Sequence, residues 1–177
     1  HGINFEDMDL RKLNIDAKDF GLHRDTVSLL VNDLSFVEKS GFYAEKIRME
    51  FSFSSKHMNF DKLRIKALGS NIQMPYLHMT FDGIEKMSHF VQEVKLDAKF
   101  ENALLKTQTL AYIVPSLSNY NIDVVLDGNV KGTINDLRAK NLVITSGTQT
   151  RIAANIHISG LPDIERTMMI LDFKELS

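Results

Sequence analysis

Apolar and polar residues alternate along most of this chain. In residues 151–159, mostly polar side chains fill one side, and the other side is apolar: Ile152, Ala154, Ile156 and Ile158. A period of two is typical of a β-strand with one face buried and one face in water. Residues 122–132 and 169–174 repeat the pattern, with glycine turns between the segments. The second half of the chain therefore predicts consecutive strands that share one apolar face.

The first half predicts further strands. Residues 46–54 show the strongest alternation, with these apolar side chains on one side: Ile47, Met49, Phe51 and Phe53. Residues 27–36, 74–81 and 95–102 also favour strands, and Pro75 indicates an edge strand or a bulge in its segment. Residues 3–22 predict two short strands.

In two segments the spacing of apolar residues changes from the period of a strand to that of a helix. In residues 84–94 apolar side chains recur at helical spacing, which predicts a helix of about three turns. Residues 110–117 carry a second helical stripe (Leu110, Ile113, Val114 and Leu117), which Pro115 interrupts, so we expect a short or kinked helix there.

A weak internal repeat supports a simple topology. Residues 9–17 and 59–67 both read polar, apolar, two charged, leucine, polar, isoleucine, charged, alanine, and residues 135–145 offer a looser third copy. The repeat favours stacked hairpins or a meander, and chance similarity among alternating strands is the alternative. We predict an all-β fold: an elongated antiparallel meander with one or two short helices, in which residues 1–177 form a single β-rich segment.

Composition narrows the function classes. The net charge of −2 and the pI near 6.3 give no basic surface for nucleic acid. Because the chain has no cysteine, disulfides and thiolate metal sites are excluded, but the compartment stays open. No apolar run approaches the roughly 18–20 residues that span a bilayer.

Candidate chemistry is sparse. The chain has no nucleophile elbow, P-loop, dinucleotide fingerprint, HExxH motif or EF-hand loop. The histidines lack metal-ligand spacing, and His157 is expected to be a solvated or hydrogen-bonded residue of a polar face. The acidic residues 6–9 lack the spacing of a calcium loop and fit a solvated strand end. We expect no enzyme activity, no cofactor and no metal; a site built from unrecognised loops, catalytic or carbohydrate-binding, is a minor alternative.

Three stretches carry a resemblance to a known family: residues 127–137 (DGNVKGTINDL), 160–164 (GLPDI) and 170–176 (ILDFKEL). The chain resembles the periplasmic repeat region of the translocation and assembly module (TamB) proteins, in their Bacteroidetes form, within the wider AsmA-like group. The resemblance runs through most of the chain and rests on turn-and-strand phrases, not on catalytic residues. It implies a curved, taco-like β-groove that reaches from the inner towards the outer membrane and carries phospholipid or helps outer-membrane assembly.

The resemblance also implies a location and partners. We expect a periplasmic segment of a larger repetitive protein, anchored in the inner membrane by a segment outside this sequence, with an outer-membrane assembly protein as partner. His1-Gly2 reads as a cloning remnant. The edge strands are expected to pair with neighbouring segments of the parent protein, and the isolated segment is prone to edge-to-edge dimers.

The apolar stripe is the candidate site. Acyl chains require continuous apolar surface without charge, and ten side chains are the candidates for such a groove: Ile47, Met49, Phe51, Phe53, Ile152, Ile156, Ile158, Met169, Leu171 and Phe173. In the alternative reading the stripe is a closed core beneath the helical segments. The protein is then a structural or interaction module that binds envelope proteins by strand addition. The eight methionines suit both readings, so the pattern leaves them open.

Overall fold

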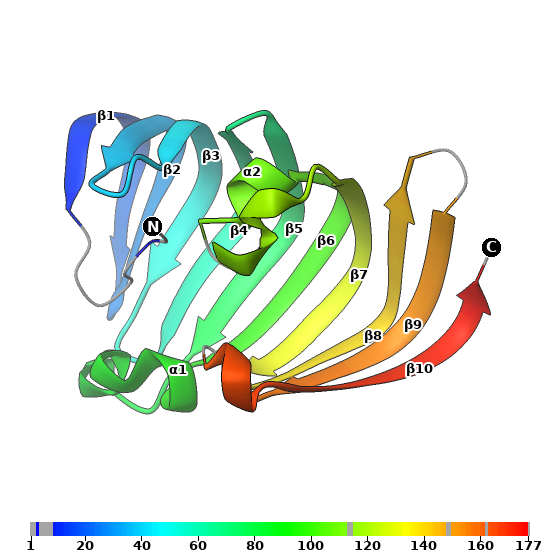
Figure 1. Cartoon of the computed structure of the whole chain (residues 1–177). Helices are drawn as coiled ribbons and strands as arrows, with labels where there is room; N and C mark the ends of the chain where they lie inside the picture. The colour runs from blue at the N-terminus through cyan, green and yellow to red at the C-terminus, as the bar shows by residue number, and fades with distance from the viewer. Residues whose placement is uncertain (1–2, 4–8, 113–114, 148–149, 162, 177) are drawn as a thin grey trace.

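The computed structural model describes residues 3, 9–112, 115–147, 150–161 and 163–176. These residues form one ten-stranded sheet, which confirms the all-β prediction (Figure 1). The strands are β1 (Leu10–His23), β2 (Thr26–Glu38), β3 (Tyr43–Phe53), β4 (His57–Ala67), β5 (Ser70–Thr80), β6 (Lys95–Lys106), β7 (Asp123–Thr133), β8 (Asp136–Ser146), β9 (Thr150–Ser159) and β10 (Met168–Leu176). The helices are η1 (Ile84–His89), α1 (Phe90–Glu93), α2 (Thr107–Leu110), η2 (Pro115–Asn119) and η3 (Ile164–Arg166).

The sheet is an antiparallel meander. Every strand pairs with its neighbour in the sequence, in the order β1 to β10. Within the described residues, β1 and β10 each pair on one side only, so both edges of the sheet are open. This is the topology that the regular succession of strands predicts.

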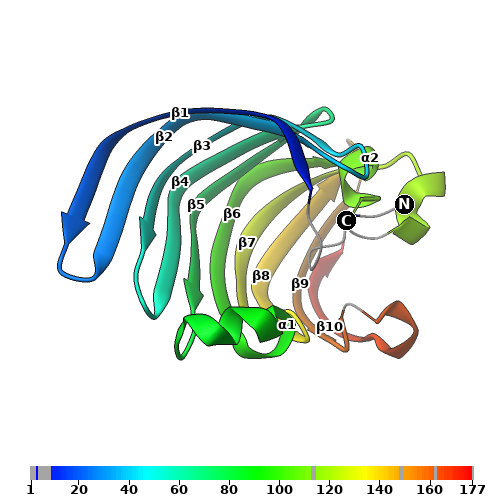
Figure 2. The same ribbon diagram turned by 90° about the vertical axis from the view of Figure 1, so that its left-hand side faces the viewer.

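The sheet is bent into an open trough (Figure 1). Figure 2 shows that the strands arch, that α2 lies on the concave side, and that α1 follows the rim at the other end of the strands. Among the described residues, three connections contain helices: β5–β6 contains η1 and α1, β6–β7 contains α2 and η2, and β9–β10 contains η3.

One face of the sheet is mainly apolar. Residues opposite each other in antiparallel strands point to the same face. Apolar residues pair in this way throughout, for example Phe51 with Phe60 and Ile156 with Leu171. Ser70 belongs to the same face through its pairing with Ala67, and its hydroxyl lies 2.7 Å from that of Thr109 in α2. Because α2 lies on the concave side, the apolar face is the concave face.

Two clusters of buried residues lie on this face. Leu63, Met74 and Ala98 form the first, within β4 to β6. The second comes from β8 and β9 and contains these residues: Ala139, Leu142, Ala154 and Ile156. The apolar side chains therefore pack mainly against one another along the curved face.

A band of β-bulges explains how the strands bend. Lys62, Asn102 and Asn141 have positive φ angles of 51°, 47° and 50°, and each marks a register shift against a neighbouring strand. A bulge inserts one residue and bends its strand. The Asp127 carboxylate accepts the Asn102 N–H at 2.7 Å, and the Asn155 side-chain oxygen accepts the Asn141 N–H at 3.0 Å. Polar side chains of adjacent strands thus satisfy backbone donors that the bulges take out of the ladder.

The internal repeat coincides with these bulges. Lys12 and Lys62 hold the same position in the two best copies, and both have a φ of 51°. In residues 135–145 the bulge residue is Asn141, between Lys140 and Leu142. Two consecutive polar residues between apolar ones are therefore the sequence pattern of a bulge in this sheet. The same pattern in Phe100-Glu101-Asn102-Ala103 is a copy that the sequence comparison missed.

Some sequence predictions need correction. Residues 10–23 form one strand with two bulges, at Lys12 and Asp19, so the two short strands predicted within 3–22 are wrong. An inserted polar residue interrupts the alternation and so looks like a strand end. Of the two alternatives for the Pro75 segment, an edge strand or a bulge, the edge strand is wrong, because Pro75 lies in the central strand β5, beside the bulge at Lys62.

The helical predictions were partly right. Residues 84–93 are helical, but the first six form a 3-10 helix, and the second segment splits into α2 and η2. Ile113 and Val114 of the second stripe lie outside the described residues, as do His1-Gly2 and most of the acidic residues 6–9.

Gly132 is the second-last residue of β7 and has a φ of 125°. A Cβ at this position would lie 2.0 Å from the backbone oxygen of Asp136. Only glycine allows the β7–β8 turn to close this tightly.

Candidate functional site

All ten candidate side chains lie on the concave face. Those of β3 pair with apolar residues of β4: Ile47 lies opposite Ile65, Phe51 opposite Phe60 and Phe53 opposite Met58. In the C-terminal half of the sheet, on the same face, Ile158 of β9 lies opposite both Leu137 of β8 and Met169 of β10. The structure therefore brings the candidates onto one surface, at two places separated by β4 to β8.

The candidates differ in exposure. Ile156 is buried, whereas the other candidates of β3 and β9 are partly buried. The β10 side chains are open to solvent, with exposed fractions of 54% for Met169, 40% for Leu171 and 56% for Phe173. The apolar surface is thus most accessible along its margin at β10.

Sequence reasoning missed much of this face. Further apolar side chains lie on it between the two groups of candidates: Phe60, Leu63, Ile65, Ile72, Met74, Leu77, Phe100, Leu126, Val130, Leu142 and Ile144. Their alternation was visible in the sequence, but the bulges shift its phase within a strand, so the residues before and after a bulge do not seem to share a face.

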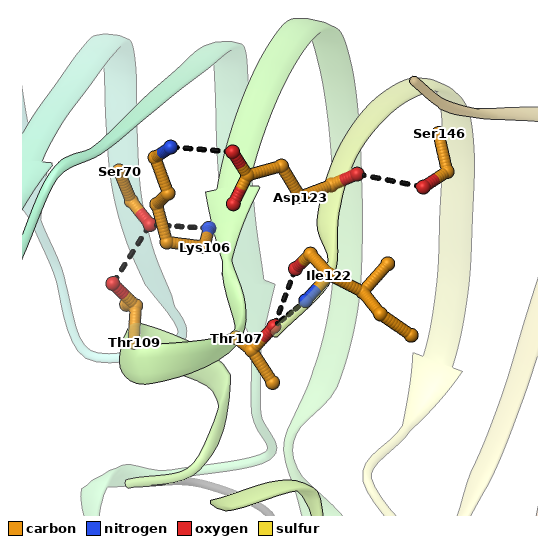
Figure 3. Close-up of polar contacts among 7 residues, drawn as sticks. All are labelled: Ser70, Lys106, Thr107, Thr109, Ile122, Asp123 and Ser146. Carbon is orange, nitrogen blue, oxygen red and sulfur yellow. Dashed lines mark hydrogen bonds and ion pairs between the residues drawn. The ribbon is translucent and has the colours of Figure 1, made fainter. Parts of the chain in front are cut away.

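The β6–β7 connection covers one end of the concave face. Thr107 and Ile122 are the first and last residues of this connection, and hydrogen bonds join them. The Ile122 N–H donates to the Thr107 hydroxyl at 2.6 Å, and that hydroxyl donates to the Ile122 carbonyl (Figure 3). The Thr109 hydroxyl donates to the Ala67 carbonyl at 3.0 Å and accepts from Ser70. Thr109 is 3% exposed. These buried hydrogen bonds fix the connection to the ends of β4 and β5.

The same connection reaches the β2–β3 turn. The Tyr112 ring packs edge-on against Phe42, with 5.5 Å between ring centroids. At the turn, Glu38 is fully buried, and its carboxylate accepts the Ser40 N–H at 2.7 Å and the Asp9 N–H at 3.4 Å. Hydrogen bonding by Ser40 lowers the pKa of Glu38, so the carboxylate stays ionised. The buried carboxylate therefore holds the β2–β3 turn through backbone hydrogen bonds.

The β5–β6 connection borders the opposite end. Phe81, 3% exposed, packs against Phe53 with 6.4 Å between ring centroids, and Val94 is fully buried. The Asn135 N–H donates to the Val91 carbonyl at 3.2 Å, which ties the connection to the β7–β8 turn. The two connections thus border the two ends of the central strands, while β1 and β10 lie beyond them.

The convex face is polar and carries ion pairs. Lys62 lies 2.6 Å from Glu50, and Lys131 lies 2.6 Å from Asp97. His157 is on this face, as expected, and its Nε2 lies 2.5 Å from the Asp136 carboxylate. Hydrogen bonding by His157 lowers the pKa of Asp136. In the described part of the chain, no three histidine or acidic side chains gather where they could hold a metal ion.

Comparisons of the chain with protein-family models, with curated proteins and with solved structures found no match. Among the described residues, no helix is both long and apolar enough to cross a membrane. The proposals below therefore rest on the geometry of the chain and on the resemblance noted in its sequence.

Proposed function

We propose that the concave face binds the acyl chains of phospholipids and that the protein is a non-enzymatic β-groove segment of a periplasmic TamB-like protein. In this proposal it passes phospholipid between the inner and outer membranes or supports assembly of the outer membrane. The supporting observation is a mainly apolar concave face on a ten-stranded sheet, with buried clusters in β4 to β6 and in β8 and β9, opposite a mainly polar convex face.

The dimensions of the face suit acyl chains. An eleven-residue strand such as β3 is about 36 Å long when extended, whereas one leaflet of bilayer hydrocarbon is about 15 Å thick. Acyl chains are flexible and need no directional partner, so a bent apolar surface is sufficient to hold them. Methionines on this face, among them Met49, Met74 and Met169, add adaptable contacts.

The direct test is lipid extraction followed by mass spectrometry, on protein purified without detergent. An equally treated unrelated β-protein serves as the reference. We expect phospholipid enriched to about one or more molecules per chain, since an open apolar surface of this size is costly to leave in water. Lipid at the level of the reference protein would count against the proposal.

Neighbouring residues of β10 provide matched variants. Leu171→Asp places a charge on the concave face, whereas Ile170→Asp places the same charge on the convex face. Both side chains are exposed, at 40% and 61%, so both variants should fold. We expect Leu171→Asp to reduce the bound lipid several-fold and Ile170→Asp to leave it unchanged. Equal loss in both variants would mean that the concave face is not the binding surface.

The open edges support a second candidate function. Among the described residues, β1 and β10 each have one edge without a paired strand, and strand addition at such edges is an established mode of protein recognition. In this alternative the protein is an interaction module for envelope proteins. Lipid-free protein that forms dimers, as measured by light scattering, and that loses them when a proline replaces Ile170 would favour this second function.

A further inference from the structure

The convex face contains a hollow of about 550 Å³ that crosses β2 to β5. Its walls include Arg48 and Glu50 on either side of Met49, and Lys62 and Arg64 on either side of Leu63. Leu63 itself is buried in the concave cluster. The hollow therefore opens on the opposite face from the proposed lipid surface and calls for a separate explanation.

Two arginines in this hollow lie directly opposite each other. Arg48 of β3 pairs with Arg64 of β4 in the register of the sheet. Like charges opposite each other on neighbouring strands destabilise a sheet. The next pair on the same face, Lys46 with Lys66, repeats the arrangement, but Lys46 is neutralised by Asp33 at 2.6 Å.

The two guanidinium groups have few partners. Arg48 donates from Nε to the Asn32 carbonyl at 2.9 Å, which leaves its two terminal nitrogens without a bond to any residue that the structure describes. Arg64 makes no hydrogen bond or ion pair within the described residues. Glu50, the nearest acid along β3, is already paired with Lys62 at 2.6 Å. Two cations thus line the hollow, and neither forms an ion pair with a described residue.

We propose that Arg48 and Arg64 form a binding site for a phosphate group. Opposite residues of an antiparallel pair have Cα atoms about 4.5–5.5 Å apart, so two guanidinium groups can converge on one phosphate. Planar guanidinium groups match phosphate oxygens with paired hydrogen bonds. The bound phosphate compensates the repulsion between the arginines. It belongs either to a lipid headgroup or to a soluble phosphate compound.

Glu101 limits the affinity of this site. It also lines the hollow, and it makes no hydrogen bond or ion pair within the described residues. Its negative charge opposes a bound phosphate. Glu101→Gln should therefore tighten phosphate binding, while either arginine variant weakens it.

The test is a titration with inorganic phosphate, monitored by the arginine Nε–H signals in NMR spectra, with potassium chloride of matched ionic strength as reference. We expect saturable shifts of the Arg48 and Arg64 signals. In the double variant Arg48→Gln, Arg64→Gln, the apparent Kd from backbone signals around the hollow should rise on the order of tenfold or more. Arg138→Gln is the matched control, because Arg138 lies on the same face but near Asp136, at 3.7 Å. It should leave the Kd unchanged.

A measurement of the Tm distinguishes loss of the phosphate site from misfolding of the variant. Because the double variant removes a repulsive pair, its Tm at low ionic strength should be equal to the wild type or higher by about 1–3 °C. Loss of phosphate binding with an undiminished Tm supports a binding site. Shifts that do not saturate, or a Kd that is the same in the double variant and in Arg138→Gln, would overturn the proposal.

Vesicles distinguish the source of the phosphate. Wild type and double variant are compared in flotation with phosphatidylcholine vesicles that contain phosphatidylglycerol. Weaker flotation of the double variant identifies a lipid headgroup as the ligand. Equal flotation, together with the loss of inorganic phosphate binding, identifies a soluble phosphate compound.

Discussion

The central strand β4 and the edge strand β1 carry the same sequence pattern but bury it differently. Leu63 and Leu13 hold equivalent positions, each directly after a lysine with a φ of 51°. Leu63 is 4% exposed, whereas Leu13 is 55% exposed. β4 has a neighbour on both sides and lies between the two helical connections, whereas β1 pairs only with β2. Burial in this sheet therefore depends on the neighbours of a strand and not on its pattern.

The other margin behaves like β1. Met169, Leu171 and Phe173 of β10 face the trough but remain exposed, although their pattern matches that of β9. The concave face is thus well packed in its middle and accessible at both margins. This arrangement allows the sheet to be stable and still offer apolar surface to a ligand.

The largest effect on stability is expected when a buried leucine of the central strand is truncated. Leu63→Ala should lower the free energy of unfolding by about 2–4 kcal/mol, because it leaves a cavity beside Met74 and Ala98. Leu13→Ala should cost below about 1 kcal/mol, because its side chain already contacts water. Urea unfolding of the two variants measures both values. Equal losses would mean that β1 is as well packed as β4.

The next effect concerns the β6–β7 connection. Thr109→Val should cost about 1–3 kcal/mol, because it removes the buried hydrogen bond from Thr109 to the Ala67 carbonyl and leaves the Ser70 hydroxyl without its acceptor, although this hydroxyl still accepts the Lys106 N–H. Thr26→Val, at the β1–β2 turn, removes only a bond to the exposed Asp25 and should change stability by less than about 0.5 kcal/mol.

Amide hydrogen exchange shows whether Thr109→Val loosens only the β6–β7 connection. In Thr109→Val, amides of residues 107–122 should exchange faster, while those of β8 and β9 should not. Uniform acceleration over the whole sheet would show that the connection is part of one cooperative unit and does not border the trough as a separate element.

A smaller effect is expected at the bulges. Asn102→Val should cost about 1 kcal/mol, because a β-branched residue is strained at a φ of 47°. Asn102→Gly should be neutral or slightly stabilising, since glycine adopts this conformation freely. Thermal unfolding compares the two variants. If they have the same Tm, backbone strain at the bulge is not what selects its residue.

The smallest effect on stability is expected when an exposed ion pair is removed, whether the pair lies in the centre of the sheet or at its margins. Asp136→Asn should slightly destabilise the protein at neutral pH, because hydrogen bonding by His157 lowers the pKa of Asp136 in the folded state. A lowered pKa stabilises the fold above the ordinary value near 4, and this contribution is lost as the pH falls through the folded value. The difference between wild type and variant should therefore shrink as the pH falls below about 4 and vanish once Asp136 is protonated in the folded state. A difference that persists in acid would point to another cause.

The strands and their order were largely predictable from the sequence. Alternation such as that of Ile47, Met49, Phe51 and Phe53 identifies a half-buried strand, and short turns between such strands favour a meander. The bulges were not recognised, although their signature, two polar residues between apolar ones, was present in the repeat around Lys12 and Lys62. Because a bulge interrupts the alternation, the pattern within β1 predicts two short strands where the structure has one.

The contacts that complete the site were beyond sequence reasoning. Nothing in the local pattern of Ser70 or Thr109 indicates that they meet, because 39 residues separate them along the chain. The pairing of Arg48 with Arg64 likewise depends on a register that a bulge shifts. Periodicity predicts which residues share a face of one strand, but contacts between strands need the positions of the bulges.

The most direct test of the central claim is site-specific photocrosslinking to phospholipid. A photoreactive amino acid replaces Phe51 or Phe173 on the concave face and, as matched controls, their chain neighbours Ser52 or Asp172 on the convex face. Mass spectrometry then detects lipid adducts after irradiation of protein purified without detergent. We predict adducts at Phe51 and Phe173 and none at Ser52 and Asp172. Adducts at all four positions, or at none, would contradict an acyl-chain site on the concave face.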